Sequence, residues 1–446
     1  MATTDRSTKL APSQPSSLAA REAFWQNVFA ACAGLVLGLA VLKFGNPVIF
    51  DQLIGRPDGF LEVVFQPWPI TWGYLLLGGL ALLALKAIRF ETTAPSWVVF
   101  LPLVWFVWQI VAGLNTIEPN LTRATLVHFG ACTLWFYMGL FGLSHVPRTA
   151  PFWLPIALAF ILVLWVGFEQ HYGGLEATRR FFYEQPDWQK YPAEYLKRMA
   201  SDRIFSTLVY PNALAGAILL YLPVTLAATW TFGHRLPRLS RSVVTGLVGY
   251  LGLACLFWSG SKAGWLIALV MAMICLAWLP FPKKAKLLVA AVVFSLGLVG
   301  FAVKFTSYFK KGATSVAARL DYWRAGVAIA KANPVFGSGP GTFSVNYAKI
   351  KPPQAEMARL THNDYLEQAC DSGLIGMAVY LTLVCGIMRF LYRKRLLNGL
   401  HISSMVWLGL LGWALHSLVE FPLYIPGLAW PAFAFLGWLS GSQRSE

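Results

Sequence analysis

Residues 359–376 read Arg-Leu-Thr-His-Asn-Asp-Tyr-Leu-Glu-Gln-Ala-Cys-Asp-Ser-Gly-Leu-Ile-Gly, and they join a polar loop to the start of an apolar helix. His362 stands at this junction, with Asn363, Asp364 and Glu367 close to it in the sequence. An imidazole changes its charge near neutral pH and can accept or release a proton. The stretch therefore has the residue types that proton-transfer chemistry needs, placed at the mouth of a membrane helix.

The composition on both sides of this stretch is that of an integral membrane protein. Of the 446 residues, 57% are hydrophobic and 13% are charged, which is far more apolar side chain than a soluble core requires. A run of about 17 to 25 mostly apolar residues is long enough to cross a bilayer. Twelve such runs occur, at residues 23–44, 70–88, 97–114, 124–144, 150–168, 209–232, 242–258, 263–280, 286–303, 373–392, 402–419 and 423–440. We therefore predict an all-α, polytopic membrane domain of about twelve spans over residues 23–440.

The formal net charge of +16 does not indicate nucleic-acid binding, because no basic soluble domain is present to carry such a site. In a membrane protein, Lys and Arg are first explained by orientation and by anionic lipid headgroups. If the amino terminus is cytoplasmic, seventeen Lys and Arg residues of the short loops and termini lie inside. Only four lie in or beside the short outer segments, namely Lys43, Arg56, Arg123 and Lys262. This bias predicts that both termini are cytoplasmic.

The same orientation places two long polar interruptions, residues 169–206 and 304–371, on the outer side of the membrane. The second has 68 residues and lies between the ninth and tenth predicted spans. Residues 1–22 are expected to form a disordered cytoplasmic segment and residues 441–446 a cytoplasmic tail. Any chemistry in the outer loops faces away from the cytoplasm. ATP and NAD chemistry are thereby disfavoured, and the sequence has no Gly-rich phosphate loop of either common pattern.

Within the larger outer loop, Val316, Leu320, Trp323 and Val327 recur at helical spacing. The residue before a proline is pushed out of the helical region, so the Asn333-Pro334 pair is expected to end this helix. Basic residues are interspersed with the apolar positions. We predict an amphipathic helix along the outer membrane-water boundary.

Two basic residues are predicted at the same membrane depth as His362. Arg203 stands where the first outer loop enters a span, and Lys262 lies in a very short outer turn between two spans. Each has an ordinary alternative explanation: His362 can simply cap its helix, and Arg203 and Lys262 can reach the lipid headgroups. Together, cations and an imidazole on one side of a membrane suit a diphosphate substrate, because phosphate oxygens accept charge-assisted hydrogen bonds.

These residues resemble the O-antigen ligase superfamily of bacterial membrane glycosyltransferases, which includes O-antigen ligases, polysaccharide polymerases and O-oligosaccharyltransferases. The family pattern is His, a small polar residue, nine residues, Gly, four residues, then Gly, Thr or Tyr. Here His362-Asn363 is followed by nine residues and Gly373, and the final position is Ala378. The resemblance covers about residues 200–440 and includes the segments Arg319-Leu-Asp-Tyr-Trp-Arg324, Pro334 to Phe343 and His416-Ser-Leu-Val-Glu420.

The resemblance implies a fold similar to that of the C-type glycosyltransferases and a site on the periplasmic side of the bacterial inner membrane. It implies a donor glycan carried on undecaprenyl diphosphate, and His362 as the general base for an acceptor hydroxyl. Arg203 and Lys262, with Arg319 or Arg324, would stabilise the leaving diphosphate. Single displacement would invert the anomeric carbon. Four further residues are secondary candidates: Asn363, Asp364, His416 and Glu420.

No cofactor and no metal site is expected, because these cations can neutralise the leaving group and no cluster has metal-ligand spacing. The acceptor stays open. A ligase would use lipid A-core and a polymerase a second lipid-linked glycan, while an O-oligosaccharyltransferase would use a protein. An alternative from another class is a transporter that binds the lipid-linked glycan without reacting, although the paired, interrupted halves typical of transporters are not seen.

Overall fold

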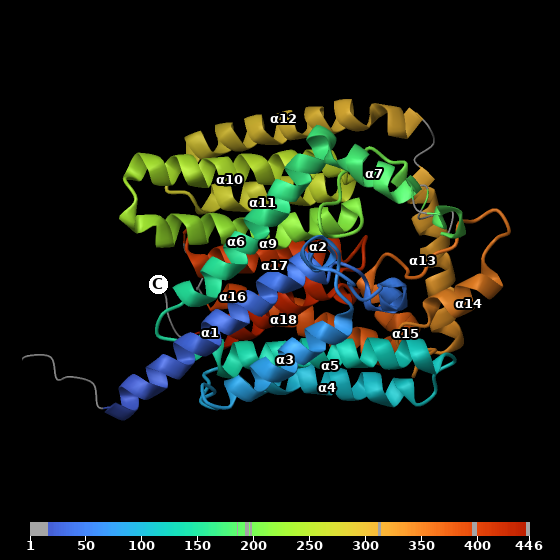
Figure 1. The fold of residues 1–446 in the computed structure, drawn as a ribbon, viewed down its shortest axis with the longest axis horizontal. Coiled ribbons are helices and arrows are strands. Elements are labelled where there is room, and N and C mark those ends of the chain that lie inside the picture. Colours follow the sequence, from blue (N-terminus) through green and yellow to red (C-terminus); the bar gives the residue numbers. More distant parts are fainter. Residues whose placement is uncertain are drawn as a thin grey trace, which may run out of the picture.

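The computed structural model describes residues 17–184, 186–191, 196, 199–310, 314–394 and 399–442. Every regular element within these residues is a helix, and they contain no strand, which confirms the predicted all-α class. Most of the long helices run side by side along one direction (Figure 1). The start of α1 (Ser17–Lys43) and the C-terminal end of α18 (Pro426–Gly441) lie at the same end of this bundle (Figure 1).

Twelve of the described helices lie at the positions of the twelve predicted spans. Eight of them, some together with the helical turns that continue them, are long and apolar enough to cross a membrane. The other four are shorter, with 15 to 17 residues: α3 (Ile70–Ala84), α11 (Lys262–Trp278), α17 (Ile402–His416) and α18. Besides α1, the longer ones are α4 (Ser96–Gly113), α5 (Pro119–Phe141), α6 (Ala150–Glu169), α9 (Pro211–Phe232), α10 (Arg238–Ser259), α12 (Lys283–Lys310) and α15 (Asp364–Leu381). The chain is a multi-pass membrane protein.

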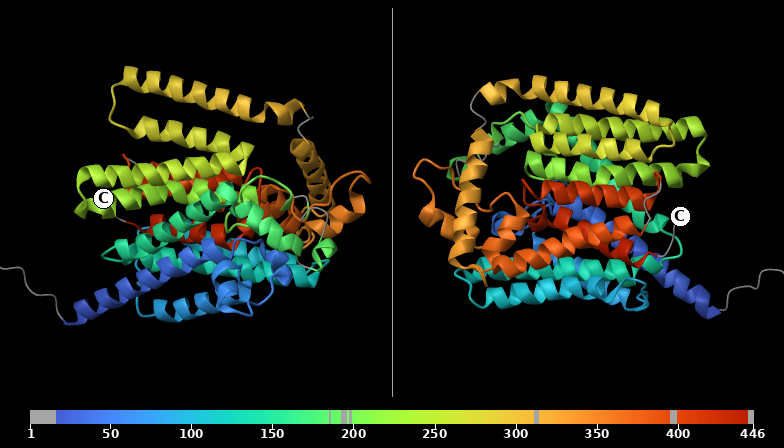
Figure 2. Two further views of the ribbon diagram at one scale, coloured as in Figure 1. Left: turned by 45° about the horizontal axis from the view of Figure 1, so that its top comes forward. Right: turned by 180° about the vertical axis from the view of Figure 1, so that it is seen from behind.

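Helix α18 forms the centre of the bundle, and all of its residues are buried. It packs closely along α5 because both helices place glycine at the contact. A Cβ atom on Gly437 would lie 2.0 Å from the Phe136 carbonyl oxygen, and one on Gly139 would lie 2.3 Å from the Ala434 carbonyl oxygen. Small residues allow membrane helices to approach in this way. In contrast, α12 is the outermost layer, beside α11 (Figure 2). Its apolar side chains are largely exposed.

The helix predicted within the larger outer loop is confirmed as α13 (Thr314–Ala332), which ends before the Asn333-Pro334 pair. It crosses the ends of the spanning helices at the end of the bundle opposite the C terminus (Figure 1). Three residues of the predicted apolar stripe, Val316, Leu320 and Val327, are 46%, 42% and 44% exposed. The fourth, Trp323, is partly buried against Tyr322 and Ile329, which belong to the buried face of the helix.

Several boundaries differ from those predicted. Helix α12 continues to Lys310 and α15 begins at Asp364, so the segment between them is shorter than residues 304–371 and contains α13 and α14 (Phe343–Ile350). The polar interruption predicted at residues 169–206 contains α7 (Leu175–Glu184). Helix α1 begins at Ser17, so residues 17–22, which were expected to be disordered, form its first turns. Residues 1–16 and 443–446 of the predicted terminal segments lie outside the described residues.

Candidate active site

A cavity of about 460 Å³ opens at the α13 end of the bundle. Its walls come from seven places: the short helix η1 (Val48–Leu53), the segment that leads into α9 with the start of that helix, the turn between α10 and α11, the end of α12, one face of α13, the loop before α15 and the loop before α18. Arg203, Lys262, Arg319, His362 and Glu420 all line it. The fold thus brings together residues that are up to 217 positions apart in the sequence, the separation of Arg203 and Glu420.

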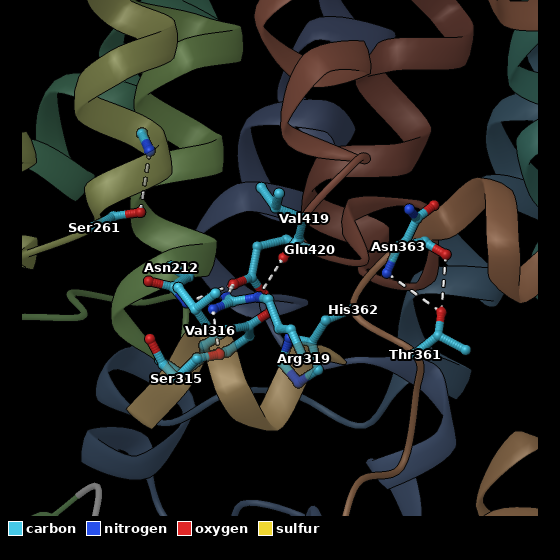
Figure 3. A network of polar contacts seen from close by, with 12 residues as sticks. Asn212, Ser261, Ser315, Val316, Arg319, Thr361, His362, Asn363, Val419 and Glu420 are labelled. Carbon is cyan, nitrogen blue, oxygen red and sulfur yellow. Dashed lines mark hydrogen bonds and ion pairs between the residues drawn. The ribbon is translucent and has the colours of Figure 1, made fainter. Parts of the chain in front are cut away.

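Glu420 is the centre of the polar contacts in this cavity (Figure 3). Its side chain is 2% exposed. One carboxylate oxygen, Oε1, accepts hydrogen bonds from Arg319 Nη2 and from Asn212 Nδ2, the latter at 2.5 Å. The other oxygen, Oε2, lies 3.0 Å from His362 Nδ1 and 3.4 Å from the Tyr210 hydroxyl. Four donors therefore satisfy one buried carboxylate.

The electrostatic surroundings of Glu420 keep this carboxylate ionised. Burial alone raises the pKa of a carboxyl group, because it disfavours the charged form. The Arg319 guanidinium, followed by His362, outweighs burial and holds the pKa of Glu420 well below its usual range. A charged carboxylate can only accept hydrogen bonds. It therefore attracts a proton onto the nearest nitrogen of His362.

His362 is oriented by its backbone, by Glu420 and by two rings. Its φ of 54° lies in the left-handed region, which non-glycine residues seldom adopt. The imidazole stacks on Tyr322 with ring centroids 5.7 Å apart and meets Phe421 edge-on at 4.8 Å. Because Nδ1 donates to Glu420, the lone pair of the neutral ring is on Nε2. The side chain is 22% exposed and lines the cavity, so this nitrogen is available to a substrate.

Arg203 is held in the cavity wall by two hydrogen bonds. Its Nε donates to the Ser259 carbonyl at 2.6 Å, and its Nη2 donates to Asn212 Oδ1 at 2.7 Å. Burial lowers the pKa of Arg203 to about 10, with Glu420 acting in the opposite direction. The guanidinium therefore remains a cation at neutral pH. Its Nη1 has no hydrogen-bond partner among the described residues and is available to an anion.

Lys262 is the first residue of α11, directly after the N-cap Ser261. Its Nζ lies 3.7 Å from the centroid of the Tyr308 ring and 5.1 Å from that of Phe305. Within the described residues it has no oxygen acceptor. A helix N-terminus carries a partial positive charge, so α11 adds to the positive potential of Lys262. The cavity wall near Arg203 and Lys262 is therefore suited to an anion.

The two predicted arginines of α13 lie on different faces of that helix. Arg319 lines the cavity, but all three of its nitrogens donate to protein oxygens: Nη2 to Glu420, Nε to the Val419 carbonyl at 3.0 Å and Nη1 to the Ser315 carbonyl at 3.3 Å. Arg324 does not line the cavity. Its side chain is 78% exposed and pairs with Asp321 at 3.5 Å. The structure therefore brings Arg319 to Glu420 and leaves Arg324 outside.

The remaining secondary candidates surround the cavity without lining it. Asn363 caps α15, and its side chain accepts a hydrogen bond from the Leu366 amide at 3.0 Å. Asp364 is fully buried and accepts from the Leu423 amide at 3.0 Å. His416 is 1% exposed, and neither ring nitrogen has a partner among the described residues.

Sequence reasoning missed Asn212, Tyr210 and Tyr322 as members of the site. Asn212 links Arg203 to Glu420, and Tyr210 and Tyr322 contact Glu420 and His362. A signal for Tyr322 existed, since it lies three residues after Arg319 and thus on the same face of a helix. No group of three or more His, Cys, Asp or Glu residues in the described parts of the chain could hold a metal ion.

Comparison with known proteins supports the family resemblance. Residues 247–381 match the family model described as O-antigen ligase. This segment includes Lys262, Arg319 and His362, but ends before Glu420. No curated protein matches the chain. The match confirms the resemblance to the O-antigen ligase superfamily, in agreement with the all-helical membrane fold.

Proposed function

We propose that this chain, with its O-antigen ligase region, is a metal-independent, inverting membrane glycosyltransferase that moves a glycan from undecaprenyl diphosphate to an acceptor hydroxyl. The acceptor that we propose is lipid A-core. The observation that carries this proposal is the pair formed by His362 and Glu420, beside the cations Arg203 and Lys262 in one cavity. A general base next to a site for an anionic leaving group is what glycan transfer from a diphosphate requires.

In the proposed reaction, the acceptor hydroxyl donates a hydrogen bond to His362 Nε2. The hydroxyl oxygen attacks the anomeric carbon, and its proton passes to Nε2. The bond between the anomeric carbon and the phosphate oxygen breaks, and undecaprenyl diphosphate leaves with the bonding electrons. Attack from the side opposite the leaving group inverts the anomeric carbon.

The residues around His362 stabilise the charges that develop during this step. Glu420 stabilises the imidazolium, because its carboxylate lies 3.0 Å from Nδ1 and attracts the positive charge that the ring gains in the reaction. Arg203 Nη1 and Lys262 Nζ balance the charge that grows on the departing diphosphate. Arg319 neutralises Glu420 on the other side, so that the buried carboxylate is not left as an unpaired charge.

We further propose that the cavity faces the periplasm of a bacterial inner membrane and that both termini are cytoplasmic. The distribution of Lys and Arg in the short loops supports this orientation. The arrangement of the described chain also supports it, because the start of α1 and the end of α18 lie at the end of the bundle opposite α13 (Figure 1).

The test is a transfer assay with purified protein and a labelled undecaprenyl-diphosphate glycan. Lipid A-core and a second lipid-linked glycan are offered in separate reactions, to wild type, His362→Ala and the exposed control Arg324→Ala, each with and without EDTA. We expect label on lipid A-core with wild type and the control, none with His362→Ala, and no effect of EDTA.

Other outcomes separate the alternatives. Lengthening of the lipid-linked glycan, lost in His362→Ala, would show a polymerase with the same chemistry. Label on neither product would move the test to a protein acceptor and then to transport of the labelled lipid in proteoliposomes. Equal transfer by wild type and His362→Ala would refute the assignment of His362 as the base.

A further inference from the structure

His362 and Glu420 reach each other from two separate loops, so their hydrogen bond depends on how these loops are held. The loop before α15 carries His362 in its left-handed conformation, and the loop between α17 and α18 carries Glu420. A non-glycine residue keeps such a conformation only when its surroundings fix it. The groups that fix both loops belong to the first turn of α15.

Glu367 holds the loop of His362. Its Oε2 accepts a hydrogen bond from the Thr361 amide, directly before His362, at 2.6 Å. The Thr361 hydroxyl in turn donates to the Asn363 carbonyl at 2.9 Å, directly after His362. Glu367 and Thr361 are fully buried. Thr361 and Asn363 are thus hydrogen-bonded to each other on either side of His362, and the Thr361 amide is also bonded to Glu367.

Asp364 holds the loop of Glu420 at both ends. Its backbone amide donates to the Ser417 carbonyl at 2.8 Å, and its side-chain Oδ2 accepts from the Leu423 amide at 3.0 Å. Glu420 lies midway between these two anchor points in the sequence. Asp364 is fully buried, like Glu367. One turn of α15 therefore connects the base to the carboxylate that orients it.

We propose that Asp364 and Glu367 are positioning residues that fix the hydrogen bond between His362 and Glu420. Neither residue lines the cavity, so they act on the reaction through the two loops and not by contact with substrate. A carboxyl oxygen accepts the amide hydrogen in each case, and a buried amide left without its acceptor is costly. This inference rests on the proposed function, because it assigns these residues to a base that must be oriented.

The experiment uses the full-length protein in the transfer assay, with Glu367→Ala and Asp364→Ala beside the conservative variants Glu367→Gln and Asp364→Asn. The alanine variants lose the acceptor oxygen, and we expect kcat to fall about 10- to 100-fold with the donor KM unchanged. The conservative variants keep a carbonyl oxygen that can accept a hydrogen bond from the same amide group. We therefore expect their kcat to be within about threefold of wild type. Thermal unfolding and binding of undecaprenyl diphosphate report whether each variant is folded.

A double-mutant cycle with Glu420→Gln separates positioning from a general structural role. If Glu367 acts through the pair, adding Glu367→Ala to Glu420→Gln costs little further activity. The proposal is overturned if the two losses multiply, if the alanine variants keep wild-type kcat, or if kcat and diphosphate binding fall together. His362→Ala in the same assay tests the proposed function separately. If it retains full activity, the base is misassigned, whereas an inactive His362→Ala with multiplying losses refutes only the positioning role.

Discussion

Replacing Glu420 by Gln tests the site most directly, because the side chain keeps its shape and loses its charge. The Gln amide has one oxygen that can accept hydrogen bonds and one NH2 group that can only donate them, whereas both carboxylate oxygens now accept. An NH2 group facing the Arg319 guanidinium is unfavourable, so the oxygen is expected to stay with Arg319 and Asn212. The NH2 group then faces His362 Nδ1. This arrangement favours a proton on Nε2, and His362 can no longer accept a proton from the cavity side.

Two effects set the size of the expected loss. Returning the proton to Nδ1 breaks the new hydrogen bond and leaves two donors facing each other, which costs about 1 to 3 kcal/mol. The stabilisation of the imidazolium by a carboxylate is also lost, and this is at most about 4 kcal/mol for unit charges about 4 Å apart near a protein surface. Allowing for partial solvation of His362, we expect a barrier higher by about 3 to 5 kcal/mol and a kcat lower by roughly 10² to 10⁴.

The assay is single-turnover transfer of labelled glycan by wild type and Glu420→Gln. The matched control is Glu176→Gln, since Glu176 is a 66% exposed carboxylate in a surface ion pair with Arg179. Such pairs contribute little, so the control is expected to keep wild-type kcat. A Glu420→Gln kcat within threefold of wild type would refute the reasoning.

Three further predictions follow from single residues. Arg203→Lys keeps a positive charge but loses the forked contacts to Ser259 and Asn212, so the donor KM should rise about 10-fold in steady-state kinetics, whereas Arg324→Lys should leave it unchanged. Gly373→Ala should lower the free energy of unfolding by about 2 kcal/mol or more, because φ at this position is 72° and a Cβ would lie 2.1 Å from a backbone carbonyl oxygen. Thermal unfolding checks this, with Gly78→Ala as the control, since a Cβ at Gly78 meets nothing within 4 Å. Because the pKa of Glu420 is lowered in the folded protein, its contribution to stability is present above the usual carboxyl pKa of about 4.3 and is lost as the pH falls below it. The difference in melting temperature between wild type and Glu420→Gln should therefore shrink below about pH 4.

The positions of the membrane spans could be predicted from the sequence because the bilayer imposes a length and an apolar composition on each one. The sequence also predicted α13 and its apolar stripe, but not which face of this helix packs on the protein. In a soluble protein an apolar stripe marks the buried face, but in a membrane protein apolar side chains can also face lipid. Val316, Leu320 and Val327 are exposed, while Tyr322, an amphipathic residue, packs inward.

The role of Glu420 could not be predicted from the sequence, because 58 residues separate it from His362. Hydropathy gives the ends of helices but not which loops meet, and it placed Glu420 only near an interface. The sequence could have shown that Arg319 and Arg324 do not both line the cavity, but not which of the two does. Five residues of a helix with 3.6 residues per turn correspond to about 140° around the axis, so both side chains could not enter one cavity.

Helical geometry and the hydrogen bonds of Arg319 together reduce the number of cations that could contact a diphosphate. Arg324 points outward, and Arg319 donates from all three of its nitrogens to Glu420, Val419 and Ser315. A diphosphate would have to break one of these bonds to bind Arg319, and breaking the one to Glu420 would release the carboxylate that orients His362. In the proposed reaction, Arg203 and Lys262 therefore balance the charge of the leaving diphosphate, while Arg319 binds the carboxylate that orients His362.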